Sequence, residues 1–165
     1  MVRVAALLGT LGLAACGSGG GGPATGASTS LECAPFARQA TGIQLYGDAA
    51  DWWHQAAGRY ERGAEPVRGG VLVFRRTGRL ARGHVSVVAG VVSSHEIKVT
   101  HANWVHRRIG RDEPVMDVSP GGDWTLVRVW WAPSHAMGMT AYPTYGFISP
   151  GRRERQDLVA GLDAP

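Results

Sequence analysis

The spacing of apolar residues changes from helical to strand-like near residue 70. Before that point, one helix is predicted over 31–41, with Ser30 as its N-cap and Gly42 after its last turn. A second helix is predicted from Asp48 as N-cap to about Tyr60, because its apolar residues form one stripe: Ala49, Trp52, Trp53, Ala56 and Ala57. Both helices therefore present an apolar face to a core.

Strands are predicted for five short segments after residue 70, from buried apolar runs or alternating apolar and polar residues: 71–74, 84–92, 95–103, 115–118 and 124–131. The region after Pro133, which contains Gly138 and Pro143, predicts loop or extended packing, with Phe147-Ile148 docked on the sheet. Helices followed by strands predict an α+β domain, with the N-terminal helices packed on an antiparallel sheet of about five strands.

The second and third predicted strands form a hairpin that brings polar side chains together. If the turn is Ser93-Ser94, His84 lies opposite Asn103 and Ser86 lies opposite His101. Directly opposed residues point to the same face, with Cβ atoms roughly 4.5–5.5 Å apart. Ser-Ser is not a strong turn pair, and a loop of odd length would break this register.

The N-terminus predicts export. A short positive start is followed by an apolar run over 4–15, which is too short to span a bilayer and fits a signal-peptide core. The tetrapeptide ending at Cys16 resembles the bacterial lipobox, which implies a signal peptide over 1–15, a lipid on Cys16 and a membrane anchor in the cell envelope. No Asp follows Cys16, which favours the outer membrane in a cell with two membranes; plain secretion is the alternative.

A flexible linker over 16–30, rich in Gly, Ser, Ala, Thr and Pro and free of charge, follows the signal. One domain is predicted over 31–150 and a polar tail over 151–165. If Cys16 carries lipid, Cys33 is a single thiol in an oxidising compartment; the alternatives are a disulfide with Cys16 or a buried, inert Cys33. The start of a helix favours the thiolate of Cys33, whereas the neighbouring Glu32 opposes it.

Composition narrows the class further. A chain of 165 residues with 44% apolar residues can bury one ordinary core. Its six Trp residues favour core packing over a groove that stacks on sugars or peptides. The net charge of +4 comes largely from clusters at 106–108, 111 and 152–155, which we interpret as solvated surface. No metal-binding spacing, phosphate loop or dinucleotide motif is present, so neither a cofactor nor a nucleic-acid partner is predicted, and a monomer is expected.

The candidate chemistry is thiol-based acyl transfer. Cys33 would attack an amide carbonyl, His84 would move the proton, and Asn103, or as second choice His101, would orient the imidazole. Backbone N–H groups at the start of the first helix would stabilise the oxyanion. The other histidines have no such context and are interpreted as surface or packing residues: His54, His95, His106 and His135.

These residues occur in an order that resembles a known family. The motifs are Cys33-Ala34-Pro35-Phe36-Ala37-Arg38, Gly-Asp-Ala with a Trp over 47–52, Gly-His-Val over 83–85, and His-Ala-Asn-Trp over 101–104. Together they resemble the CHAP domain, a cysteine- and histidine-dependent amidohydrolase/peptidase family of bacterial cell-wall enzymes. The resemblance implies a papain-like fold, Cys33 as nucleophile and His84 as base. Many relatives have Glu where this chain has His101, so the orienting residue stays open.

The resemblance implies cleavage of peptidoglycan, either at the bond from N-acetylmuramate to L-alanine or within the peptide stem and cross-bridge. The alternative is a catalytically silent lipoprotein that binds the cell wall. A third possibility is an amidase that acts on another peptide-like amide. The presence of both Cys33 and His84 favours the enzyme, because a binding module needs neither.

Overall fold

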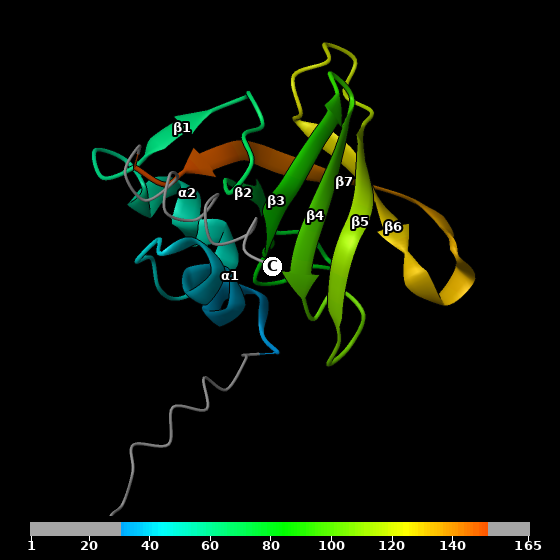
Figure 1. Cartoon of the computed structure of the whole chain (residues 1–165), viewed down its shortest axis with the longest axis horizontal. Coiled ribbons are helices and arrows are strands. Elements are labelled where there is room, and N and C mark those ends of the chain that lie inside the picture. Colours follow the sequence, from blue (N-terminus) through cyan, green and yellow to red (C-terminus); the bar gives the residue numbers. More distant parts are fainter. Residues whose placement is uncertain (1–30, 152–165) are drawn as a thin grey trace, which may run out of the picture.

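The computed structural model of the chain describes residues 31–151 and is mostly β-structure (Figure 1). Its helices are α1 (Cys33–Thr41) and α2 (Trp52–Gln55), with 3-10 turns η1 (Ala49–Asp51) and η2 (Ala132–Ser134). Its strands are β1 (Glu61–Gly63), β2 (Val71–Phe74), β3 (His84–Ser93), β4 (Glu96–Ala102), β5 (Ile109–Asp117), β6 (Leu126–Trp131) and β7 (Ala136–Ser149). The predicted signal peptide, lipidated Cys16, linker and nearly all of the C-terminal tail lie outside the described residues.

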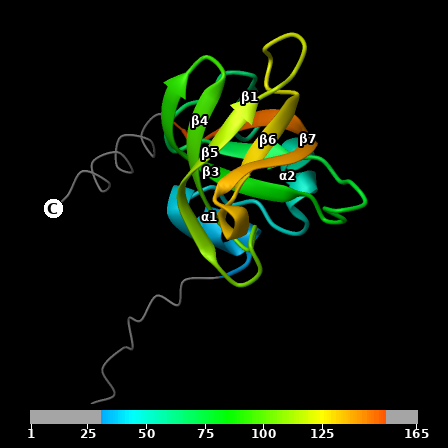
Figure 2. The same ribbon diagram turned by 90° about the vertical axis from the view of Figure 1, so that its right-hand side faces the viewer.

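The sheet closes into a six-stranded antiparallel barrel. The strand order is β1-β7-β2-β3-β4-β5-β6, and a further pairing of β7 with β6 completes the ring. Figure 2 shows the strands curving round to close this barrel, while β1 adds to β7 outside it. The predicted α+β, papain-like arrangement of helices packed on about five strands is therefore wrong: the described residues form a closed barrel with two short helices.

The barrel strand that was not predicted is β7, whose segment was predicted to be loop or extended packing because it contains Gly138 and Pro143. Pro143 is the last residue that pairs with β6, opposite Leu126, and Thr144 is the first that pairs with β2, opposite Phe74. Proline has no N–H to donate to a ladder, so it fits where one strand changes neighbours. Strand β5 is also longer than predicted, since it begins at Ile109.

The helical layer is shorter than predicted. Helix α1 begins at Cys33, with Glu32 and not the predicted Ser30 at its N-cap position. It ends at Thr41 and is followed by Gly42, whose φ of 73° permits the left-handed turn. The expected second helix divides into η1 and α2 and ends at Gln55. Asp48 occupies the N-cap position of η1, as predicted, but its side chain makes no capping hydrogen bond. Its carboxylate pairs with the guanidinium groups of Arg76, at 3.0 Å, and Arg82, at 2.9 Å.

Two clusters of buried side chains lie on opposite faces of the barrel wall. Along β2, Val71 and Val73 face the helices, whereas Leu72 and Phe74 join the cluster inside the barrel, as the two-residue period of a strand requires. Every barrel strand contributes to the inner cluster, which also contains Trp124. In Figure 1, α1 and α2 lie together on one side of the barrel. The inner face of β3 therefore carries its alternate residues from His84 onward towards this dry interior.

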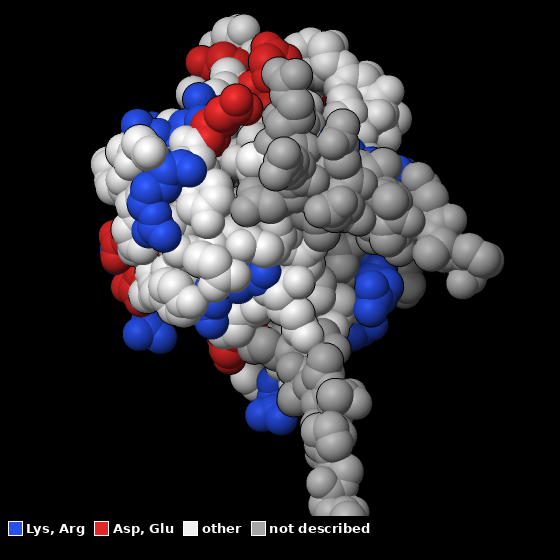
Figure 3. Space-filling view, turned by 60° about the vertical axis from the view of Figure 1, so that its left-hand side comes forward, with Lys and Arg blue, Asp and Glu red and all other residues white. Residues whose placement is uncertain are grey.

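Charge is dispersed over the face shown in Figure 3, where blue Lys and Arg side chains form several separate groups with white surface between them. Red Asp and Glu side chains lie beside some of these groups. Of the basic clusters interpreted as solvated surface, residues 106–108 and 111 are exposed, and 152–155 lie outside the described residues. No helix within residues 31–151 is long and apolar enough to cross a membrane.

Replacing Phe147 by Ala tests the barrel core. Phe147 is 1% exposed and packs edge-on against Trp124, with ring centroids 5.6 Å apart. We expect Phe147→Ala to lower the free energy of unfolding by about 3–5 kcal/mol, measured by urea denaturation. Met139, in the same strand, is 86% exposed; Met139→Ala should change stability by less than about 0.5 kcal/mol. Equal effects of the two changes would contradict the closed barrel.

Candidate active site

A hollow of about 590 Å³ lies where α1 and β3 begin. Cys33 reaches it from the first turn of α1, His84 from the first residue of β3, and Asn103 from the segment just after β4. Arg38 and Arg82 line it as well. The thiol and the imidazole singled out from the sequence, which are far apart in the chain, therefore line one hollow.

Gly83 fixes where β3 starts. Its φ is 72°, and a Cβ atom there would lie 2.6 Å from Cβ of Ala50 and 2.7 Å from the carbonyl oxygen of Phe74. The chain passes η1 this closely because the N–H of Ala50 donates to the carbonyl of Arg82, at 3.1 Å. Only glycine fits this approach, so the Gly-His pair delivers His84 to the hollow with a fixed backbone direction.

A hydrogen-bonded line of side chains starts at His84 and crosses three strands. His84 Nε2 lies 3.1 Å from His101 Nδ1, and His101 Nε2 lies 2.9 Å from Glu113 Oε2. The hydroxyl of Ser86 also lies 2.9 Å from His101 Nδ1. His84 is 3% exposed and His101 is 0% exposed, so solvent offers these nitrogens no alternative partner.

The carboxylate of Glu113 determines which ring nitrogens of His101 and His84 carry a proton. An ionised carboxylate can only accept, so His101 carries its proton on Nε2 and its Nδ1 is an acceptor. His84 then donates from Nε2 to that nitrogen. In this assignment, made from the network, Nδ1 of His84 keeps a free lone pair, as a base requires.

Aromatic rings enclose both imidazoles. Trp104 stacks on His101 with centroids 5.6 Å apart and lies 5.0 Å from the ring of His84. Phe74 meets His84 edge-on, with centroids 5.4 Å apart. These contacts restrict rotation of the rings and keep water from the bonds between them, which strengthens those bonds electrostatically.

Asn103 does not lie beside His84 as the hairpin register predicted. The pairs Val87–Thr100 and Val88–Val99 have the predicted register, but β4 ends at Ala102 and Asn103 adopts φ 63°. Its side chain donates to the carboxylate of Glu32 at 3.1 Å and accepts from the N–H of Arg107 at 2.8 Å.

The hairpin turn itself is displaced by one residue. Ser93 pairs with Glu96, so Ser94 and His95 form the turn, and two register shifts along the ladder restore the expected pairing near the site. Of the two candidates for orienting His84, the structure therefore places His101 in contact with it.

Burial favours the neutral forms of both candidate reactive groups. It raises the pKa of the Cys33 thiol, and hydrogen bonds with the backbone of Val85 and Ala34 offset this only in part; the charge of Glu32 raises the pKa further. Burial also holds the pKa of His84 well below its usual value, and a protonated His101 would lower it further by repulsion. The resting site therefore holds a thiol and a neutral imidazole.

Glu113 was not singled out from the sequence, because no element was predicted for it and the predicted strand began at Val115. A signal was present, because Glu113, Val115 and Asp117 alternate, and the last two are buried. Gly110 was a second signal: a Cβ atom there would lie 2.4 Å from the carboxyl carbon of Glu113. A glycine at that position leaves room for the carboxylate to reach His101.

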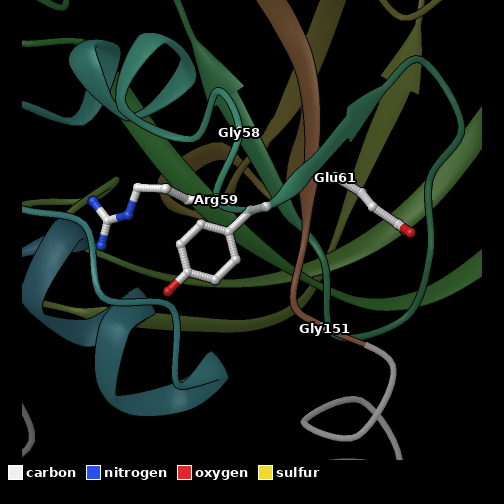
Figure 4. Close-up of a pocket in the computed structure, with 5 residues that line it drawn as sticks. Gly58, Arg59, Glu61 and Gly151 are labelled. Carbon is white, nitrogen blue, oxygen red and sulfur yellow. The ribbon is translucent and has the colours of Figure 1, made fainter.

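The other candidate groups have no part in this arrangement. His54, His95, His106 and His135 are exposed, and no three His, Cys, Asp or Glu side chains within residues 31–151 form a metal-binding group. A separate hollow of about 480 Å³ is lined by Gly58, Arg59, Tyr60, Glu61 and Gly151. Figure 4 shows Arg59 and Glu61 pointing away from each other there.

Comparison with known proteins identifies the family of the chain. Residues 22–103 match the family model described as CHAP domain, which takes in Cys33, His84 and His101 but stops before Glu113. No curated protein gives a significant match to the chain. CHAP domains are typically amidohydrolases or peptidases that act on peptidoglycan, so the match supports an enzyme of that broad class. The chain belongs to the CHAP domain family.

Proposed function

We propose that this protein hydrolyses an amide bond of peptidoglycan with Cys33 as nucleophile and His84 as base. The observation that carries the proposal is that the two side chains line one hollow while His84 Nε2 is engaged by His101, which leaves Nδ1 for the thiol proton. A thiol with an adjacent oriented base is the usual arrangement for covalent acyl transfer. His101, rather than Asn103, is the orienting residue.

The reaction starts from the neutral pair. His84 Nδ1 takes the thiol proton as Sγ of Cys33 bonds to the amide carbonyl carbon, which forms a tetrahedral oxyanion. His84 then gives the proton to the amide nitrogen, the C–N bond breaks, and an amine leaves behind a thioester. Water, deprotonated by His84, attacks the thioester, and collapse of the second tetrahedral adduct releases a carboxylic acid and returns the proton to Sγ.

The start of α1 stabilises the oxyanion in this scheme. The N–H groups of Cys33 and Ala34 are in the first turn of a nine-residue helix, where donors have no intrahelical acceptor. Pro35 follows them and has no N–H to donate. Two donors beside the sulfur can therefore receive the negative charge as it develops on the carbonyl oxygen.

The substrate would bind at the rim of the hollow, which carries both positive and negative side chains. Arg38, Arg79 and Arg82 line the hollow together with Asp48 and Glu32. Guanidinium groups suit the carboxylates of peptide stems. The bond cut is either the muramoyl-alanine bond or a bond within the stem or cross-bridge, and the products released from purified sacculi, identified by mass spectrometry, distinguish the two.

We also propose that the protein acts in the cell envelope, anchored through lipid on Cys16. The support is the apolar run over 4–15 and the tetrapeptide before Cys16. A chain with Cys16→Ser should appear in the soluble fraction after export, whereas the wild type should fractionate with membranes. A wild type found in the soluble fraction would remove the anchor and leave the catalytic proposal standing.

Single substitutions test the catalytic assignment. Cys33→Ala and His84→Ala should reduce release of soluble fragments from sacculi to background while the chain stays folded. Asn103→Ala should slow release by roughly 10-fold to 100-fold, because small misplacements of catalytic groups cost about that much. His106→Ala, at an exposed position, is the matched control and should be neutral. Equal activity of the wild type and Cys33→Ser would remove the hypothesis.

The pH dependence of thiol alkylation tests the resting state. Because the pKa of Cys33 is raised, its thiolate fraction, and hence its rate with iodoacetamide, should still be rising at a pH where an ordinary thiol has reached its plateau. The measurement uses a Cys16→Ser background, so that only Cys33 reacts. A rate that is already constant below pH 7 would indicate a thiolate–imidazolium pair and would contradict the neutral pair.

A further inference from the structure

We propose that Glu113 is a positioning residue of the active site, because its carboxylate keeps the proton of His101 on Nε2 and thereby keeps His84 in its reactive tautomer. The inference rests on the proposed function. It concerns a residue beyond the stretch that matches the family model. The geometry that carries it is the line from His84 on β3 through His101 on β4 to Glu113 on β5, with distances of 3.1 and 2.9 Å.

An imidazole in the orienting position can act in two ways, and only one of them supports catalysis. With the proton on Nε2, His101 accepts from His84 Nε2–H, and His84 Nδ1 stays free as the base. With the proton on Nδ1, His101 donates to His84 Nε2. A neutral His84 would then carry its proton on Nδ1 and could take none from the thiol.

Ser86 cannot decide between these states. Its hydroxyl lies 2.9 Å from His101 Nδ1, but a hydroxyl can donate or accept and therefore fits either tautomer. The carboxylate of Glu113 can only accept when ionised, so it selects the state with the proton on Nε2. Its side chain is only 12% exposed, which limits competition from water for this bond.

The backbone is shaped to admit this carboxylate. The ladder between β4 and β5 shifts register between Val99 and His101, and His101 pairs with Gly110. At that glycine a Cβ atom would overlap the carboxyl group of Glu113. A register shift and a glycine at one point of the ladder bring a side chain from three residues further along β5 to the ring of His101.

The charge of Glu113 also acts on the proton transfer. When His84 becomes an imidazolium, the nearby groups are Cys33 from α1, His101 from β4 and Glu113 from β5, and Arg108 lines a small cavity beside Glu113. A negative charge at the end of the line favours the protonated form of His84 in the transition state. Loss of that charge should therefore make His84 a weaker base.

The first test compares Glu113→Gln with Asp112→Asn, on soluble peptidoglycan fragments. The amide at 113 can donate to His101 Nε2 and so permits the wrong tautomer. Replacing the Asp of a serine-protease triad by Asn lowers kcat about 10⁴-fold. Glu113 is one residue further from the base, so we expect Glu113→Gln to lower kcat about 100-fold and to leave KM within about twofold of the wild type. The acid limb of kcat/KM should move to lower pH. Asp112 is exposed and has φ 51°, which Asn also tolerates, so Asp112→Asn should match the wild type.

The second test restores a carboxylate next to His84. A Glu at position 101 can accept directly from His84 Nε2–H and has no tautomer to control. We expect His101→Glu/Glu113→Gln to be at least tenfold more active than Glu113→Gln. If Glu113→Gln does not fold, the double variant alone tests the inference, because it also lacks the carboxylate of Glu113. An active double variant supports the inference, and a folded but inactive one overturns it.

Outcomes separate this inference from the proposed function. A wild type that digests peptidoglycan, together with a Glu113→Gln variant of the same kcat and pH profile, overturns the inference alone. A lowered kcat without rescue in the double variant, at equal melting temperatures, makes Glu113 merely structural and also overturns it. A wild type without activity, whose Cys33 alkylation is indifferent to His84→Ala, removes the proposed function.

Discussion

The hydrogen bond between the imidazoles of His84 and His101 is the interaction on which the active site depends. Two buried imidazoles present four ring nitrogens, and a buried polar atom left without a partner costs about 1–3 kcal/mol. The described structure satisfies three of these nitrogens through each other and through Glu113. The fourth, His84 Nδ1, is the one available for chemistry. The same bonds therefore reduce the cost of burial and leave a single reactive atom.

The closed barrel makes this bond possible. Because β3, β4 and β5 are neighbours in one curved sheet, inward-facing residues of the three strands meet inside it. Closure by β7 brings Tyr142 against Trp104, with ring centroids 5.1 Å apart, and Trp104 in turn stacks on His101. A strand that looked like loop in the sequence thus completes the aromatic wall around the imidazoles.

Asn103 contributes to the same enclosure from the backbone. Its left-handed conformation ends β4 just before Trp104, and Asn adopts this conformation more readily than most residues. Its side-chain amide donates to Glu32, the residue before Cys33. One side chain therefore ties the loop that carries Trp104 to the start of α1. This accounts for an Asn in the predicted site, although its side chain bonds to Glu32 and Arg107 and not to the imidazole of His84.

Local patterns in the sequence predicted the site better than the fold. Alternation in β3 and β4 placed Ser86 opposite His101, in agreement with their hydrogen bond. The stop of α1 before Gly42 followed from local chemistry, but the helix starts at Cys33, with Glu32 and not the predicted Ser30 at the N-cap position. Barrel closure could not be predicted in this way, because it depends on β7 pairing with β6 up to Pro143 and with β2 from Thr144. The position of Asn103 was missed because register alone does not show where a strand ends.

The neutral resting pair bears on how the proposed nucleophile would persist in the oxidising compartment that the N-terminal sequence predicts. Oxidation of cysteine follows its thiolate fraction and its exposure. Burial raises the pKa of Cys33, and the thiol is only partly exposed. The sulfur is therefore protected while the hollow is empty. In the proposed mechanism, Cys33 becomes nucleophilic only as His84 removes its proton, and that transfer is favourable when a carbonyl carbon stands close enough to accept the new bond. Under that mechanism, the burial that slows the reaction of Cys33 with small oxidants also couples its activation to the presence of substrate.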